Sequence, residues 1–234
     1  MRLNPHLRGH LLQFDPVSAP ELSTGAGVRL VVAALLLEIV RLAAVEWLRP
    51  GIPLGVILPG LLAVAVLAIP VMAGIGLVPL GLRPWRDWTT TERSYFLQVI
   101  IIANVIFPLV LAPRLEGRAE APGLAWTLWH VILPYLCFGF YQELVYRGAL
   151  QTASVRSWGA TRGILVVNLL YTFGPLHWSY FAAPPSLSVP MFLAIFVVGL
   201  YFGFLYQRSG NLWLPAVFHA IGNAYMIWSV TPVS

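Results

Sequence analysis

The chain has 234 residues, of which 59% are hydrophobic and only 10% are charged. A soluble domain carries about 25% charged residues, and here apolar segments recur along the whole chain, so the composition excludes a soluble protein and a soluble body on a single anchor. The net charge is +5, and all fourteen basic residues are arginine. Because no stretch combines clustered basic residues with aromatic ones, nucleic acid is not an expected partner.

Residues 1–26 lack the continuous apolar core of a cleavable signal peptide, since they contain Asp15, Glu21 and three prolines. We expect them to be a cytoplasmic lead-in and residues 27–234 to be one transmembrane bundle. The single cysteine, Cys137, lies in an apolar run. It can form no intramolecular disulfide and is expected to be a small packing group.

A helix that crosses a bilayer needs about 20 mainly apolar residues. By this measure the chain is predicted to be an all-α polytopic transmembrane bundle with about seven spans. The expected spans are 28–48, 53–80, 94–113, 124–150, 162–181, 188–207 and 212–230. The second contains Pro59 and Pro70, which predict a kink or tilt.

Arginine placement predicts the orientation, because loops on the cytoplasmic side are enriched in basic residues. With the N-terminus in the cytoplasm, ten arginines fall on the inner side, three on the outer side, and Arg41 within a span. The protein is therefore expected in the cell (inner) membrane with a cytoplasmic N-terminus. The inner set is Arg2, Arg8, Arg29, Arg83, Arg86, Arg93, Arg147, Arg156, Arg162 and Arg208, and the outer set is Arg49, Arg114 and Arg118.

Ionisable residues inside a membrane helix are costly and usually functional or paired. In the first span Glu38 and Arg41 are three residues apart and are expected to form a structural ion pair. Most of the other polar and ionisable residues of the spans lie in the fourth, fifth and seventh, and these three spans could gather them in one interior site. They are His130, Gln142, Glu143, Arg147, Asn168, His177, His219 and Asn223.

Spacing then groups these side chains. Glu143 and Arg147 are four residues apart and can pair on one face, whereas Gln142 points about 100° away. His219 and Asn223 also share a face, one turn apart. His177 follows Pro175, which removes a backbone hydrogen bond and should kink the fifth span.

Three motifs occur in order: Gln142-Glu143-x-x-x-Arg147, Phe173-x-x-x-His177 and His219-x-x-x-Asn223. They resemble those of the CAAX prenyl protease and bacteriocin-processing (CPBP) intramembrane proteases, whose pattern is Glu-Glu-x-x-x-Arg, then Phe-x-x-x-His, then His-x-x-x followed by Asn or a small residue. The resemblance covers about residues 124–230.

The resemblance implies a glutamate-dependent endopeptidase that acts on a membrane-embedded or lipid-modified peptide or protein, such as a CAAX-type tail, a leader or a C-terminal sorting signal. It implies that His177 binds and polarises the water, that His219 and Asn223 form the oxyanion hole, and that Glu143 pairs with Arg147. It also implies catalysis without a metal or other cofactor, although Glu143, His177 and His219 are residue types that can bind zinc.

One position departs from the family pattern. The first motif glutamate, the usual activator of the water, is Gln142 here, and a neutral amide cannot accept a proton. Three hypotheses follow. Glu143 is the base, or His177 is the base while Gln142 orients the water, or the protein is an inactive homologue that binds membrane peptides in an immunity or chaperone-like role.

Two further points stay open from the sequence. The expected span edges put Gln142 near the inner end of its helix and His177 near the outer end of its own, so either an edge is wrong by about a turn or Pro175 brings the two together; we favour the first. A transporter or channel is a further alternative, but no inverted pair of broken helices indicates one.

Overall fold

The computed structural model describes residues 23–115 and 123–228, and this part of the chain is helical with no strand. The expectation of an all-α fold is thereby confirmed for the described residues. The predicted lead-in lies outside them except for its last four residues. The helices are α1 (Thr24–Ala43), α2 (Leu54–Ala73), α3 (Thr90–Leu115), α4 (Leu124–Thr127), α5 (Leu133–Glu143), α6 (Thr152–Trp158), α7 (Ala160–Phe173), α8 (Pro185–Ser209) and α9 (Trp213–Trp228).

Shorter π and 3-10 segments connect or extend these helices. The π segments are η3 (Ala44–Leu48), η7 (Leu128–Ile132) and η8 (Leu144–Gln151), and the 3-10 segments are η4 (Val78–Leu80), η5 (Trp85–Asp87) and η9 (Pro175–Ala182).

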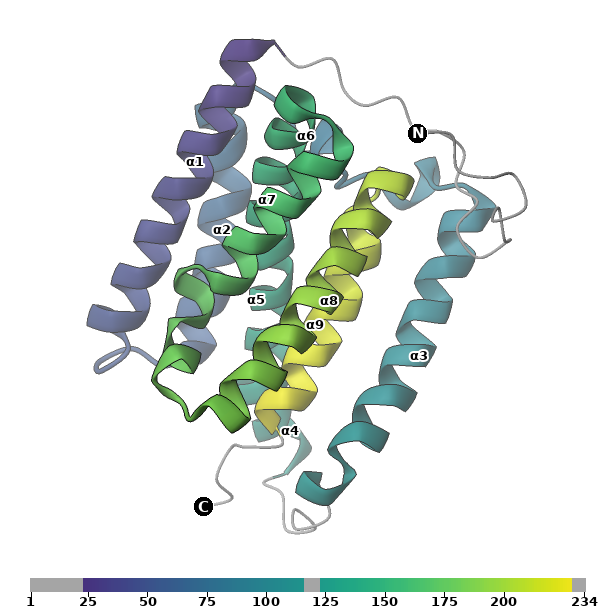
Figure 1. Cartoon of the computed structure of the whole chain (residues 1–234). Helices are drawn as coiled ribbons and strands as arrows, with labels where there is room; N and C mark the ends of the chain where they lie inside the picture. Colours follow the sequence, from purple (N-terminus) through teal and green to yellow (C-terminus); the bar gives the residue numbers. More distant parts are fainter. Residues whose placement is uncertain (1–22, 116–122, 229–234) are drawn as a thin grey trace.

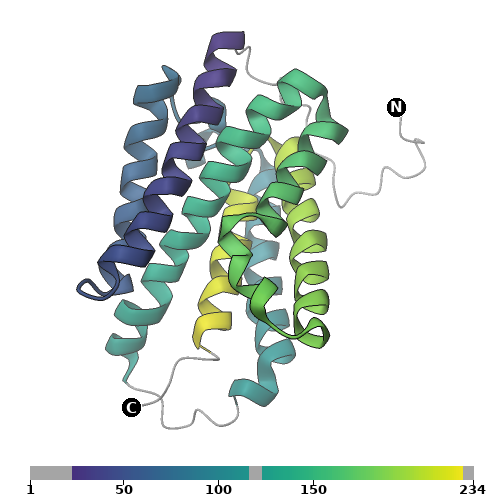
Figure 2. The ribbon, with the colours of Figure 1, turned by 60° about the vertical axis from the view of Figure 1, so that its left-hand side comes forward.

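A single long rod spans α4, η7, α5, η8 and α6, because the residues at each junction keep right-handed helical backbone angles. Figure 2 shows it running the length of the bundle. At 1.5 Å per residue, residues 124–158 extend over about 50 Å. The predicted end of this span near residue 150 is therefore wrong. The rod ends only where Gly159, with φ of 78°, adopts a backbone conformation that side chains disfavour.

Two other predicted spans end early. The second was expected to reach residue 80, but α2 ends at Ala73, where Gly74 takes a left-handed conformation with φ of 69°. The fifth was expected to reach residue 181, but α7 ends at Phe173. Gly174 is extended there, and Pro175 has no N–H to continue the helix.

Within the described part of the chain, three helices are long and apolar enough to cross a membrane: α2, the Thr90–Ala112 part of α3, and α8. They expose large apolar side chains such as Leu67, Val110 and Leu193, each more than 60% accessible. Apolar surface of this extent suits lipid rather than water. The apolar helices thus indicate a multi-pass membrane protein.

The long rod is the centre of the bundle. Its α5 part packs against α2 on one side and α9 on another, and α1 packs along α2 and η8. All eight residues of η8 are buried. In contrast, α3 stands at the periphery, where it packs mainly on α9 (Figure 1). The rod that carries the first motif therefore occupies the interior.

Polar side chains tie the interior to α8. Three buried donors reach backbone carbonyls on one face of that helix, and its two glycines allow the close approach. A Cβ on Gly199 would lie 2.2 Å from the Asn168 side-chain oxygen, and one on Gly203 2.9 Å from that of Gln151. The three bonds run from Asn168 to Phe196 O (2.9 Å), from Arg147 to Gly199 O (3.0 Å) and from Gln151 to Gly203 O (2.8 Å).

Arginines predicted to be cytoplasmic gather at one end of the bundle. The start of α1, the end of α2, the end of α6, the start of α7 and the end of α8 lie at one end of the bundle (Figure 1). These ends carry Arg29, Arg156, Arg162 and Arg208 from the set assigned to the cytoplasm. Arg147 is an exception, because it is 99% buried inside the bundle rather than at a helix end.

Candidate active site

The site is built where α5 crosses α9 at very short distance. Gly139 faces Ala220 so closely that a Cβ on Gly139 would lie 2.5 Å from the Ala220 Cα. Gly139 is one turn before Glu143, and Ala220 directly follows His219. The small residues therefore bring the first and third motifs together.

Glu143 lies at the centre of the site. Its Oε1 is 2.7 Å from His219 Nδ1 and 3.3 Å from Arg147 Nη1, and its side chain is completely buried. Because a carboxylate only accepts hydrogen bonds, Nδ1 of His219 is the donor in this contact. The predicted pairing of Glu143 with Arg147 is confirmed. Glu143 Oε2 has no partner among the described residues.

Gln142 and Asn223 form a second contact across the same interface. The Asn223 amide donates to Gln142 Oε1 at 2.9 Å. Gln142 is 4% exposed, and Asn223 is half-buried. No described residue accepts a hydrogen bond from the side-chain nitrogen of Gln142, so this group can still donate. The residue that replaces the family's usual carboxylate therefore supplies an N–H group in its place.

His177 is positioned by the break after α7. In a continuing helix the N–H of residue 175 would bond to the carbonyl of Tyr171, but proline has no N–H. The freed Tyr171 carbonyl lies 2.9 Å from His177 Nδ1 instead. Since a carbonyl only accepts, Nδ1 donates, and the neutral ring has its lone pair on Nε2. Pro175 therefore sets the tautomer of His177 as well as ending the helix.

Tyr171 connects the two histidines and was not among the predicted site residues. Its ring contacts the rings of His177 and His219 edge-on, with centroids 5.2 and 6.0 Å apart, and its hydroxyl is 3.2 Å from His219 Nε2. The Arg147 guanidinium lies over its face at 4.2 Å. The i to i−4 relation between Pro175 and Tyr171 is the sequence signal that could have identified it.

Most of the predicted residues gather in two neighbouring groups of contacts, but His130, which is exposed, Asn168, which donates to the Phe196 carbonyl, and Phe173 lie outside them. Gln142 contacts Asn223, Glu143 contacts His219 and Arg147, and His177 reaches His219 through Tyr171. Phe173 is not part of the cluster, because its ring is 43% exposed and packs on Phe192 instead. That position faces outward at the last residue of α7.

The sequence predicted Gln142 and His177 at different depths in the membrane because the predicted helix ends were wrong. Gln142 lies in the middle of a rod that continues to Trp158, not near its inner end. At the same time α7 ends at Phe173, so His177 lies after the helix rather than inside it. Both differences move the two residues toward a common level.

The Glu38–Arg41 pair forms as predicted, with 2.9 Å between Arg41 Nη2 and Glu38 Oε2. Both residues are more than 90% buried. Tyr141 on α5 donates to the Leu37 carbonyl (2.8 Å) and lies 3.3 Å from Glu38. The pair thus joins α1 to the rod beside the site, with each charge compensated.

A metal site is not formed by the described side chains. Among residues 23–115 and 123–228, no three His, Cys, Asp or Glu side chains come close enough together to hold a metal ion. Glu143 and His219 are in contact, but His177 is separated from them by Tyr171.

Comparison with known proteins agrees with the resemblance found in the motifs. No curated protein and no solved structure matches the chain. Residues 124–225 match the family described as Rce1-like type II CAAX prenyl endopeptidase. The match begins with the long rod and ends two residues after Asn223, so it contains every residue of the cluster. Residues 124–225 therefore form a domain of the Rce1-like type II CAAX prenyl endopeptidase (CPBP) family.

Proposed function

We propose that this protein is an intramembrane endopeptidase that hydrolyses a peptide bond of a membrane-embedded or lipid-modified protein or peptide. The observation that carries the proposal is the double contact across α5 and α9, Glu143 with His219 and Gln142 with Asn223. It gathers hydrogen-bond donors and a histidine–carboxylate pair inside a bundle of apolar helices. In such a dry site, preorganised donors stabilise developing negative charge strongly.

We further propose that residues 27–234 act as one bundle of seven spans with a cytoplasmic N-terminus. The helices of residues 23–115 and 123–228 form seven rods when the segments from α4 to α6 count as one. α1 and α2 pack directly on the family domain through η8 and α5, and α3 packs on α9. The substrate would then reach the site from the bilayer.

Burial argues against Glu143 as the base. Its side chain is fully enclosed, and its Oε1 already interacts with His219 and Arg147. A neighbouring arginine also lowers the basicity of a carboxylate. Glu143 is better suited to orient His219, since a carboxylate at Nδ1 fixes the tautomer and orientation of an imidazole.

His177 is the better candidate for the base. It is half-buried, and its Nδ1 donates to the Tyr171 carbonyl, which leaves the Nε2 lone pair available. In the proposed reaction, water attacks the peptide carbonyl carbon while Nε2 accepts its proton. The Gln142 and Asn223 amides donate to the resulting oxyanion, and the protonated imidazole then gives its proton to the leaving amine as the C–N bond breaks.

The test is cleavage of a membrane-peptide library by the purified protein in detergent, with products read by mass spectrometry. His177→Asn is the decisive variant, because asparagine can still donate to the Tyr171 carbonyl but has no basic nitrogen. His130→Asn is the matched control, since His130 Nδ1 makes the same kind of contact, 3.0 Å from the Trp126 carbonyl, at an exposed site on the long rod. We expect His177→Asn to lose at least about 100-fold in turnover and His130→Asn to retain wild-type activity.

A second function, binding without cleavage, is favoured by the absence of the family's usual carboxylate base. With Gln142 neutral and Glu143 enclosed, the protein could bind membrane peptides without cleaving them. The variant Gln142→Glu distinguishes the two functions. Under the binding function, wild type is inert toward the whole library and the variant gains cleavage. If wild type cleaves and His177→Asn cleaves equally well, the protease proposal stands but the role of His177 is wrong.

A further inference from the structure

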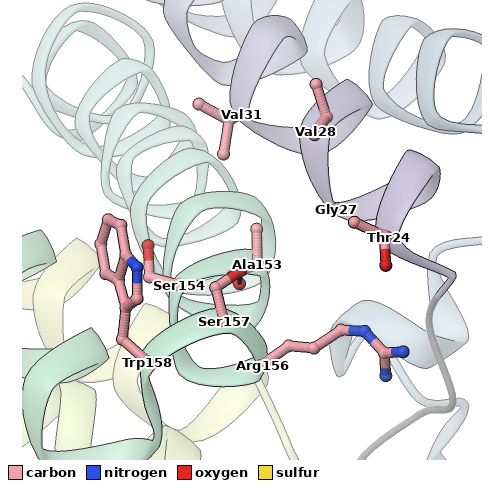
Figure 3. Close-up of a pocket in the computed structure, with 9 residues that line it drawn as sticks. All are labelled: Thr24, Gly27, Val28, Val31, Ala153, Ser154, Arg156, Ser157 and Trp158. Atoms are coloured by element: carbon pink, nitrogen blue, oxygen red, sulfur yellow. Dashed lines mark hydrogen bonds between the residues drawn. The ribbon is translucent and has the colours of Figure 1, made fainter.

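A cavity of 530 Å³ lies at the opposite end of the rod from α4, between α6 and the first turns of α1. Figure 3 shows the residues around it. Ser154 and Glu143 are eleven residues apart on one rod, so about 16 Å of helix separates the cavity from the candidate active site. Its lining is Thr24, Gly27, Val28, Val31, Ala153, Ser154, Arg156, Ser157 and Trp158.

The polar part of this lining suits an anion. Ser154 is 92% buried, yet its hydroxyl has no hydrogen-bond partner among the described residues. Arg156 is exposed and has no ion-pair or hydrogen-bond partner in the described part of the chain either. The lining contains no acidic residue. The positive end of the α1 dipole at Thr24 adds to the attraction for negative charge.

The apolar part suits a hydrocarbon chain. Val28 and Val31 on α1 and Trp158 on α6 line the same cavity as Arg156 (Figure 3). Val28 is 60% and Trp158 54% exposed, so the rim opens to the outside of the bundle. A ligand that fits both parts has a charged head and an apolar tail.

With α2 taken to span the hydrocarbon core, the cavity lies at the level of lipid head groups. The Arg29 side chain donates to the Ala73 carbonyl at 3.0 and 3.1 Å, so α2 ends level with Arg29. α2 has 20 residues and measures about 30 Å, the thickness of the hydrocarbon core. Thr24 is five residues further out, or about 7 Å. The cavity therefore opens where head-group phosphates lie.

We propose that this cavity binds the phosphate head group of an anionic phospholipid. The Arg156 guanidinium and the Ser154 and Thr24 hydroxyls hold the phosphate, and one acyl chain lies against Val28 and Val31. Basic pockets between membrane helices on the cytoplasmic side recognise anionic lipids in this way. The site is independent of the proposed protease activity.

The test uses the full-length protein in neutral detergent, titrated with phosphatidylglycerol, phosphatidylcholine or inorganic phosphate, with bound lipid counted by native mass spectrometry. Arg156→Gln removes the charge. Gly27→Leu fills the cavity without changing charge, because a Cβ at Gly27 meets nothing within 4 Å. Arg162→Gln is the matched control, an exposed arginine at the same end of the bundle that does not line the cavity.

We expect phosphatidylglycerol to bind more tightly than phosphatidylcholine and to resist millimolar phosphate. Arg156→Gln should weaken it about fivefold, Gly27→Leu should weaken it at least as much, and Arg162→Gln should leave it unchanged. Equal weakening in Arg162→Gln would mean diffuse charge attraction and would overturn the proposal. So would displacement of the lipid by inorganic phosphate, or wild-type binding in both Arg156→Gln and Gly27→Leu. Thermal unfolding of each variant verifies that it folds.

Discussion

The substitution Gly139→Ala tests the geometry on which the candidate site depends. Gly139 lies against Ala220 at the crossing of α5 and α9, and an added Cβ would lie 2.5 Å from the Ala220 Cα and 2.7 Å from its nitrogen. These neighbours are backbone atoms, which cannot rotate away as the end of a side chain can. The helices must therefore move apart.

The size of the effect follows from the distances. Ordinary contact begins at 3.4 Å, so the crossing must widen by 3.4 − 2.5 = 0.9 Å. The His219–Glu143 and Asn223–Gln142 contacts, at 2.7 and 2.9 Å, would stretch by a similar amount and pass beyond about 3.5 Å, where a hydrogen bond is lost. Overpacking of this kind costs about 2 kcal/mol, which corresponds to a fall in Tm of about 4–8 °C.

The assay is thermal unfolding of the purified protein in detergent, followed by peptide cleavage at a temperature where the variant is folded. The control is Gly60→Ala, in a helix of the same bundle, because a Cβ there meets nothing within 4 Å. Removing a helix-interior glycine should leave the Tm unchanged or raise it slightly. If Gly139→Ala melts within about 1 °C of wild type and cleaves equally well, the close crossing of α5 and α9 is wrong.

Three further predictions test the interior of the site. Arg147→Met leaves Glu143 buried without its cation and is expected to destabilise the protein by about 3–5 kcal/mol, whereas Glu143→Gln combined with Arg147→Met should recover most of the loss in thermal unfolding; an additive double variant would contradict the pairing. Tyr171→Phe removes only the hydroxyl near His219 and should lower kcat about fivefold with little change in Tm, and a wild-type kcat would exclude a role for that hydroxyl. Cleavage is expected to persist after dialysis against a metal chelator; activity that is lost and then restored by zinc would show that a metal takes part.

The spacing of the motifs was enough to predict which side chains share a face. The separation of four residues between Glu143 and Arg147, and between His219 and Asn223, puts each pair on one side of a helix, and the structure joins the two pairs across α5 and α9. Spacing alone could not show how closely the two helices approach. That depends on Gly139 and Ala220, which have no side chain large enough to keep the helices apart.

Helix ends were harder to predict, because the rod carries polar residues whose partners lie on another helix. Arg147 was assigned to the inner side, yet it and Gln151 are buried and donate to carbonyls of α8. The partners lie about fifty residues away in the sequence, so no local pattern reveals them. Gly159 was the reliable signal for the end of the rod, since only its left-handed φ interrupts the helix.

The replacement of the family's glutamate by Gln142 changes the chemistry of the site more than its geometry. Asn223 donates to Gln142 Oε1, and it would donate equally to a carboxylate oxygen at that place, so either residue fits the same contact. What the side chain at position 142 loses is the ability to accept a proton. Glu143 cannot supply it freely while it is enclosed by Arg147 and His219, and His219 has contacts at both ring nitrogens. Within the cluster, His177 keeps a ring nitrogen without a contact. In the proposed function, the imidazole of His177 therefore takes the place of the carboxylate base.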